Sequence, residues 1–226
     1  MITLADINRL YRSDEVETTA LREVELQVDE GEFVAIMGPS GSGKSTLLNI
    51  LGLIDKPTSG RHFLKDEEVS QMSEADRAKM RRRHLGFIFQ SFNLIDELTV
   101  AENIELGLAY REKSAGNRRE RVAEAMDRVG IGHRARHYPH QLSGGQQQRA
   151  AIARAIVGKP GLLLADEPTG NLDTANGAQV MDILQSLNDE GATIVMVTHS
   201  PSQADQAKRV VNMLDGRIVA SSRRAV

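Results

Sequence analysis

Residues 38–45 carry the strongest chemical signal in the chain. They run Gly38-Pro39-Ser40-Gly41-Ser42-Gly43-Lys44-Ser45 and follow the G-x-x-x-x-G-K-S pattern of a phosphate-binding loop. The glycines let backbone N–H groups approach phosphate oxygens with no Cβ in the way. The Lys44 ammonium can reach the β- and γ-phosphates, and the Ser45 hydroxyl can ligate Mg²⁺. We therefore expect this loop to bind the phosphates of a nucleotide.

Two acids and a histidine could supply the remaining groups that phosphoryl transfer to water needs. Asp166 and Glu167 follow the apolar run Leu162-Leu163-Leu164-Ala165. We expect Asp166 to lie beside Ser45 and hold Mg²⁺, directly or through water, and Glu167 to face the attacking water. His199 follows another apolar run and could donate a hydrogen bond to the γ-phosphate, which would keep the water in line with Glu167. Taken alone, His199 would more often be a structural histidine.

Gln90 is a candidate for coupling the site to another part of the assembly. It follows the apolar run Leu85-Gly86-Phe87-Ile88-Phe89. Its amide could contact Mg²⁺ or the attacking water, while the loop from Ser91 to Glu102 contacts something else. Without the other motifs, Gln90 would be an ordinary amide at the end of a strand.

The elements that must position these residues alternate between strand-like and helix-like patterns. Glu32–Met37, Gly161–Ala165 and Thr193–Val197 are predicted buried strands, and Lys44 to Leu53 is a predicted helix. In a parallel sheet the carboxyl ends of the strands meet at one edge, where ligands bind. The sequence therefore predicts an α/β fold in which three separate segments bring their polar residues to one place.

Leu142-Ser143-Gly144-Gly145-Gln146 predicts a second anion site. Ser143 is a good helix cap, and a helix-forming stretch continues to Ile156. Exposed N–H groups at a helix N-terminus attract anions, but the chain offers no second phosphate for them. The alternative is a flexible Ser/Gly turn that only caps a helix.

The rest of the chain predicts one domain over residues 1–226 with an inserted helical part. Ile2 to Ile7 and Ala20 to Val28 look like strands of an N-terminal β part that extends to about Lys65. Within the interval of about 92–157, residues 92–140 are rich in Glu, Arg and Ala, with Val122, Ala125, Met126 and Val129 on one helical stripe and Gly130 as a stop. We interpret this interval as a helical subdomain.

Composition restricts the function further. The 226 residues are 40% apolar, carry a formal charge of −3 and contain no cysteine. This charge argues against a nucleic-acid partner, and the lack of cysteine excludes disulfides and is compatible with a reducing, cytoplasmic location. No run is apolar enough to cross a bilayer, so we expect any membrane role to need a partner.

These motifs together resemble the ATP-binding cassette (ABC) superfamily, in the same order and over essentially the whole chain. Leu142 to Gln146 matches its signature, Asn171-Leu172-Asp173 its D-loop, and Tyr11 the aromatic residue that stacks on adenine, although half-buried packing is the alternative for Tyr11. The resemblance implies a P-loop NTPase core with a mainly parallel sheet, an antiparallel β part and an inserted helical subdomain. It implies ATP and Mg²⁺ as cofactors, with Ser45, Gln90 and Asp166 on the metal. The implied catalytic residues are Glu167, His199, Gln90 and Lys44, and the implied nucleotide contacts are Tyr11, Gly38, Ser40, Gly41, Ser42, Gly43, Lys44, Ser45, Thr46, Gln90, Ser143, Gly144, Gly145, Gln146 and Asp173.

The resemblance also implies partners. In this superfamily the signature of one copy binds the γ-phosphate held by the loop of a second copy, in a head-to-tail dimer. The runs Asp166–Asp173 and Gln90–Ile95 look like the MacB and LolD group, whose ATPases pair with a four-helix membrane subunit of the MacB, LolCE or FtsX kind. The expected function is thus an ATPase that powers export or extraction of a peptide, drug or lipoprotein from the inner face of the membrane. The alternatives are an FtsE-like regulator of the cell envelope and a soluble ABC ATPase acting on nucleic acid or ribosomes.

Three features stay open at this point. Many relatives have Asp after the switch histidine, whereas Ser200-Pro201 follows His199 here, and Pro201 could begin a helix. Asn171 stands where Ser or Ala is common. The basic run Arg77–Arg83 is either a solvated helix face or a surface for anionic lipids or an acidic partner.

The histidines other than His199 show no metal-site spacing, and we expect them to be solvent-facing or structural: His62, His84, His133, His137 and His140.

Overall fold

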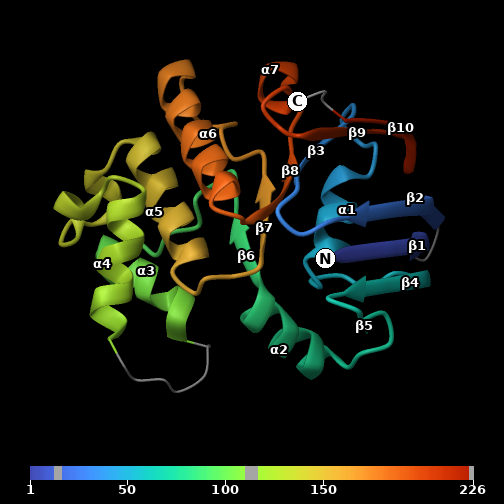
Figure 1. Cartoon of the computed structure of the whole chain (residues 1–226), viewed down its shortest axis with the longest axis horizontal. Coiled ribbons are helices and arrows are strands. Elements are labelled where there is room, and N and C mark those ends of the chain that lie inside the picture. The colour runs from blue at the N-terminus through green and yellow to red at the C-terminus, as the bar shows by residue number, and fades with distance from the viewer. Residues whose placement is uncertain (13–16, 110–116, 224–226) are drawn as a thin grey trace.

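The computed structural model describes residues 1–12, 17–109 and 117–223, and it contains two sheets (Figure 1). The first has the order β2-β1-β4-β5 and the second the order β10-β9-β3-β8-β7-β6. The strands are β1 (Ile2–Arg12), β2 (Glu17–Val28), β3 (Phe33–Met37), β4 (Ser59–Leu64), β5 (Glu67–Glu68), β6 (Leu85–Ile88), β7 (Leu162–Asp166), β8 (Thr193–Val197), β9 (Arg209–Leu214) and β10 (Arg217–Arg223). The helices are α1 (Lys44–Leu51), α2 (Glu74–His84), α3 (Val100–Ala109), α4 (Arg118–Arg128), α5 (Gly144–Ile156), α6 (Thr174–Asp189) and α7 (Pro201–Ala204), with 3₁₀ turns at Gly132–Arg134 and Pro139–Gln141.

The predicted α/β class is confirmed by the pairing of the strands. The first sheet is antiparallel, and in the second only β10 runs antiparallel to its neighbour. Strands β3, β8 and β7 lie side by side, so the three predicted polar strand ends share one edge. The predicted limits were slightly too long: α1 ends at Leu51, because Leu53 takes a left-handed φ of 56°, and β6 ends at Ile88.

Alternate residues of the parallel strands pack into two separate hydrophobic cores. Phe33, Ala35, Ile194 and Met196 belong to the core on the side of helices α3 to α6. Val34, Ile36, Val195 and Val197 belong to the core shared with α1 and the antiparallel sheet. Because both faces of the sheet are covered, these strands are continuous apolar runs and do not alternate with polar residues.

The helices α3, α4 and α5 lie in the interval 92–157, to the left of the sheet in Figure 1. The predicted stripe of α4 is buried, and Gly130 with a φ of 71° follows the end of that helix. The first helix of this interval begins at Val100, and of residues 92–99 only Asp96 and Glu97 lie in a turn and Leu98 in a bend. Its apolar side chains are continuous with those under the sheet, and its status as a separate subdomain stays a prediction.

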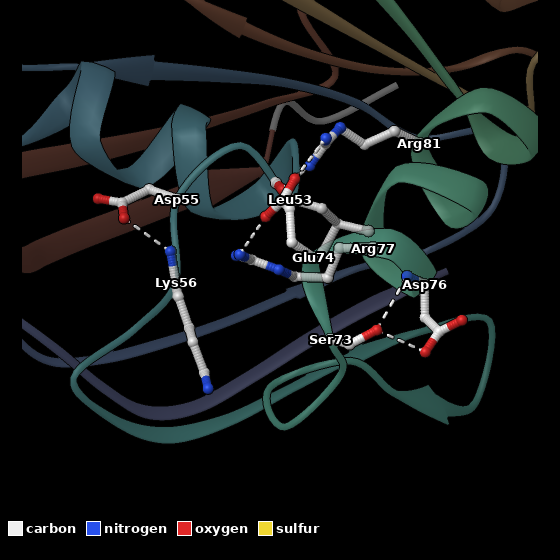
Figure 2. Close-up of polar contacts among 8 residues, drawn as sticks. All are labelled: Leu53, Asp55, Lys56, Ser73, Glu74, Asp76, Arg77 and Arg81. Atoms are coloured by element: carbon white, nitrogen blue, oxygen red, sulfur yellow. Dashed lines mark hydrogen bonds and ion pairs between the residues drawn. The ribbon is translucent and has the colours of Figure 1, made fainter. Parts of the chain in front are cut away.

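Helix α2 carries the basic run, and its first turn fixes two of the arginines (Figure 2). Ser73 caps the helix by accepting a hydrogen bond from the Asp76 N–H at 3.2 Å. Glu74 forms ion pairs with Arg77 and with Arg81, and Arg81 also donates to the carbonyl of Leu53. The bond from Arg81 is the main reason why the pKa of Glu74 lies below its usual range. Arg81 therefore attaches α2 to Leu53, whereas the ion pair of Arg77 lies within α2 itself, so at Arg81 the basic run is more than a solvated face.

Within the described part of the chain, no helix is both long and apolar enough to cross a membrane.

His62 is buried in β4 and makes the stability of the fold depend on pH. It is 1% exposed, and burial lowers its pKa from 6.5 to about 4. The unfolded chain therefore takes up a proton between these values that the folded chain does not, so the free energy of unfolding is highest above pH 6.5 and falls as the pH drops toward 4. We predict a loss of roughly 2 kcal/mol between pH 7.5 and pH 5 from this residue alone. Urea unfolding at the two pH values measures it.

His62→Leu is the variant that isolates this effect. The backbone N–H of His62 donates to Ser70 Oγ at 2.7 Å, and this bond does not depend on the side chain. We expect the variant to fold and to lose most of the difference between pH 7.5 and pH 5. An unchanged difference would assign it to other groups.

Candidate active site

The phosphate loop joins β3 to α1 and has a backbone that only glycine allows at two points. Gly43 has a φ of 97°, and a Cβ there would lie 2.5 Å from the carbonyl oxygen of Ala20. Gly38 has a φ of 156°, and its Cβ would lie 2.3 Å from the carbonyl oxygen of Met213. Ser40 and Gly41 are exposed at the tip of the loop, and Ser45 and Thr46 lie in the first turn of α1. The predicted loop residues are thus together at the end of β3.

Lys44 lies inside this loop. Its side chain is buried, and Nζ donates to the carbonyl oxygens of Gly38 and Pro39, both at 2.8 Å. An ammonium group has three N–H donors, so one more acceptor can be served from the same position. The hydroxyl of Ser42 is also buried, with no hydrogen-bond partner among the described residues. A loop with a central cation and an unpaired hydroxyl fits a bound phosphate.

Asp166 is the last residue of β7 and belongs electrostatically to the same site. Burial raises the pKa of its carboxyl, the charge of Glu167 raises it further, and the Lys44 ammonium opposes both. A partly buried carboxylate beside a second acid is stabilised by a cation. The described residues contain no cluster of three His, Asp or Glu that would bind a metal alone. Asp166 and the Ser45 hydroxyl are oxygen ligands that suit Mg²⁺, with nucleotide phosphates completing the set.

Glu167 and His199 are in direct contact. Nδ1 of His199 lies 3.0 Å from Oε2 of Glu167. Glu167 has a φ of 43°, rare for a residue with a Cβ, and its N–H donates to the carbonyl of Val197 at 2.9 Å. If Nδ1 donates to the carboxylate, Nε2 is an acceptor in the neutral ring and a donor in the imidazolium. The contact brings the predicted base and the predicted histidine to one point beyond β7 and β8.

The segment after His199 takes the conformation that Pro201 favours. Ser200 is extended, with φ −91° and ψ 114°, and Pro201 is the first residue of α7, as predicted. The N–H of Ser200 donates to Thr198 Oγ1 at 3.0 Å, and that hydroxyl donates to Gln203 at 2.9 Å. These two hydrogen bonds therefore support the backbone after His199, with Ser200 in the place where many relatives have Asp.

Gln90 forms a reciprocal pair with Asn171, a contact that our sequence reasoning missed. Nε2 of Gln90 donates to Oδ1 of Asn171, and Nδ2 of Asn171 donates to the carbonyl of Gln90, both at 3.1 Å. Ala could make neither bond, and Ser has one polar atom where Asn171 uses two, so the unusual Asn171 was a signal that the sequence offered. Any contact of Gln90 with a metal or a water stays a prediction.

The signature forms a capped helix terminus. Ser143 Oγ accepts from the Gln146 N–H at 3.3 Å, and Gln146 Oε1 accepts from the Ser143 N–H at 3.1 Å. This reciprocal pair is a capping box, which orders the first turn of α5. A Cβ on Gly145 would lie 2.2 Å from Oδ1 of Asn176, so a larger residue there would displace the Asn176 side chain. Helix α5 lies on the other side of β7 and β8 from α1, so the signature and the phosphate loop are not joined within the chain (Figure 1).

Asp173 and Tyr11 have clear structural partners. Asp173 caps α6, since Oδ1 accepts from the Asn176 N–H at 2.9 Å, and this bond lowers its pKa. Tyr11 is 40% exposed, and its hydroxyl donates to Asp55 at 2.8 Å. Arg9 pairs with the same carboxylate and lies 4.4 Å from the ring centre, so it covers one ring face. The nucleotide contacts of both residues stay predictions.

Comparison with known proteins is consistent with this geometry. A family model described as ABC transporter matches residues 21–170. An uncharacterized ABC transporter ATP-binding protein of Methanocaldococcus jannaschii is 51% identical over 219 residues, which cover 97% of this chain and 98% of that protein. The macrolide export ATP-binding/permease protein MacB 1/2 of Paracoccus denitrificans is 48% identical over 223 residues, which cover 99% of this chain and 33% of that protein.

The solved structures agree. A dimeric ATP-binding cassette in a post-hydrolysis state, bound to ADP and Pi, superposes with a TM-score of 0.91 at 42% identity, with full coverage of both chains. A family model over more than half of the chain, together with relatives of the same length and about half identical, places this chain in the ABC transporter family of ATPases.

Proposed function

We propose that this chain is the ATP-hydrolysing subunit of a MacB- or LolD-like membrane complex, working as a head-to-tail dimer of two copies. The dimer is supported by one observation. The phosphate loop and the signature turn both expose a helix N-terminus suited to phosphate, and the helices that follow them, α1 and α5, lie on opposite sides of β7 and β8. A γ-phosphate in the loop of one copy could meet the signature of another. The dimeric cassette with ADP and Pi is a precedent.

The described residues divide the reaction among them. The loop backbone and Lys44 bind the phosphates, while Asp166 and the Ser45 hydroxyl would hold Mg²⁺, which neutralises charge on the transferred phosphoryl group. Glu167 accepts a proton from the attacking water, and His199 orients both the carboxylate and the γ-phosphate. The terminus of α5 in the second copy stabilises the oxyanions that develop. Gln90, paired with Asn171, connects this site to the loop from Ser91 to Glu102.

The membrane role rests on the relatives. MacB of Paracoccus denitrificans is named as both ATP-binding protein and permease, and this chain matches a third of it. We infer that this chain acts on the cytoplasmic face with a separate integral membrane subunit of the four-helix kind, and that the complex exports or extracts a peptide, drug or lipoprotein. A net charge of −3 argues against nucleic acid as a partner.

Purification of the tagged chain from its own cells tests this proposal. We expect it to sediment with membranes and to co-purify, after detergent extraction, with a protein of four predicted transmembrane helices. The control is the same purification of Lys44→Ala, which should keep the membrane partner and lose ATPase activity. A wild-type chain found with nucleic acid or ribosomes, and with no membrane protein, would refute the proposal.

A further inference from the structure

Gln148 is a fully buried amide in the second turn of α5. It is 0% exposed, and it lies five residues after Ser143. Its Nε2 donates to the carbonyl oxygen of Phe89 at 3.3 Å and to that of Pro168 at 2.5 Å. One side chain thus uses both of its N–H donors on two segments that lie far from it in the sequence.

The orientation of this amide is fixed by its partners. Both neighbours are carbonyl oxygens, so the NH₂ end must face them, because the oxygen end would be repelled. The cost is that Oε1 is buried with no hydrogen-bond partner among the described residues. An unpaired buried oxygen lowers stability, and an apolar side chain would avoid that cost. The two donated bonds are the physical reason for an amide here.

The two carbonyls belong to the neighbours of the reacting groups. Phe89 precedes Gln90, and Pro168 follows Glu167. The segment from Glu167 to Asn171 is attached at its start to the end of β8, through the N–H of Glu167 and the carbonyl of Val197. At its end it is attached to Gln90 through Asn171. Gln148 supplies the connection from the middle of this segment to α5.

Helix α5 makes this connection stiff. Gln148 lies about 7.5 Å along the helix axis from the capped signature turn, since each residue rises about 1.5 Å. Further along the same helix, Arg154 donates to the carbonyl of Phe92 at 2.7 Å, so the segment after Gln90 is also held. A displacement of the signature turn would therefore move both segments together.

We propose that Gln148 is a positioning residue, which passes the placement of the signature turn to Gln90 and Glu167 of the same chain. This inference rests on the proposed function, because it assigns a role within that ATPase cycle. Binding of a γ-phosphate by the signature would fix α5, and Gln148 would then hold the carboxylate of Glu167 at the right distance. Each copy would thus hydrolyse ATP faster when its own signature is engaged.

Gln148→Met tests the two donated bonds. Met has similar length and no donor, so the core stays filled while both bonds are lost. We expect kcat for Mg-ATP to fall about 10-fold or more, with KM within about twofold of wild type, because the phosphate loop is untouched. The matched control is Gln147→Met, at the preceding residue, whose amide bonds among the described residues only to the nearby carbonyl of Leu142, at 3.2 Å. We expect it to keep the wild-type kcat.

Gln148→Glu adds a second measurement, the pH dependence of kcat, which a purely structural role of Gln148 would leave unchanged. Its ionised carboxylate would face two carbonyl oxygens and push them apart, whereas the protonated acid can donate to one of them. We expect the ratio of its kcat to that of wild type to rise several-fold from pH 8.5 to pH 6, with no such rise for Gln148→Met. A constant ratio, or a Gln148→Met variant with wild-type kcat, would overturn the proposal.

Hydrogen–deuterium exchange separates this proposal from the proposed function. On the full chain without nucleotide, peptides over residues 86–92 and 165–172 should exchange faster in Gln148→Met than in Gln147→Met. Equal exchange would overturn the role of Gln148. A wild-type chain that hydrolysed no ATP would refute the proposed function, while the exchange result would still decide whether Gln148 holds both segments.

Discussion

The Glu167→Gln chain is expected to hydrolyse ATP at least about 100-fold more slowly than wild type, which is the usual contribution of a positioned general base. Glutamine keeps the shape of the side chain and removes the group that accepts a proton from water. The phosphate loop, Lys44 and the signature are unchanged, so ATP should still bind and should hold two copies together. Steady-state phosphate release measures the rate, and gel filtration with Mg-ATP measures the dimer.

Geometry is the reason to choose Glu167 and not its neighbour Asp166 as the base. Glu167 contacts His199 at 3.0 Å, whereas the carboxyl of Asp166 is influenced by the charge of Lys44. The matched control is Glu190→Gln, which breaks an ion pair with Arg128 remote from the phosphate loop. We expect that control to keep wild-type turnover. Normal turnover in Glu167→Gln would exclude this carboxylate as the base.

The sequence predicted the sheet and its active edge because the physics there is local. Strands buried on both faces are unbroken apolar runs, and the predicted runs are followed by polar residues or, after Met37, by the phosphate loop. Thr193–Val197 has the predicted limits, and β7 is shifted by one residue, ending at Asp166. Three such runs leave few arrangements other than neighbouring parallel strands, since their polar ends must reach one ligand. The Ser143 cap was predictable for the same reason, because its partner Gln146 is three residues away.

Contacts between distant segments were not predictable in this way. Gln90 and Asn171 are 81 residues apart, and Gln148 reaches Phe89 across 59 residues. Such pairs depend on how loops and helices pack, and amide side chains show no periodicity that would indicate their partners. His62 illustrates the same limit: its burial follows from the pairing of β4 with β1, where it lies opposite Leu4. The sequence permitted both a structural and a solvent-facing histidine there, and the sheet makes it structural.

Two inactive variants, Lys44→Ala and Ser143→Asp, are expected to restore activity when they are mixed. Lys44→Ala removes the cation of the phosphate loop. Ser143→Asp keeps an equally good helix cap but adds a negative charge that repels a γ-phosphate. In a head-to-tail dimer of one copy of each, both changes fall in one site and the second site is intact. Equal mixing gives half mixed dimers with one intact site each, so we expect recovery of up to about one quarter of wild-type activity, and less where the disabled signature of the Ser143→Asp copy slows its own Glu167.

The double variant Lys44→Ala/Ser143→Asp provides the matched control for this mixing experiment. Mixed with either single variant it leaves no intact site, so activity should stay at the level of the variants alone. Recovery in the first mixture and none in the second can arise only if the phosphate loop and the signature of one site come from different copies. A mixture of the two single variants that gave only the average of their separate rates would place the complete site within one chain. Helices α1 and α5 lie on opposite sides of the sheet, which is why we expect the first outcome.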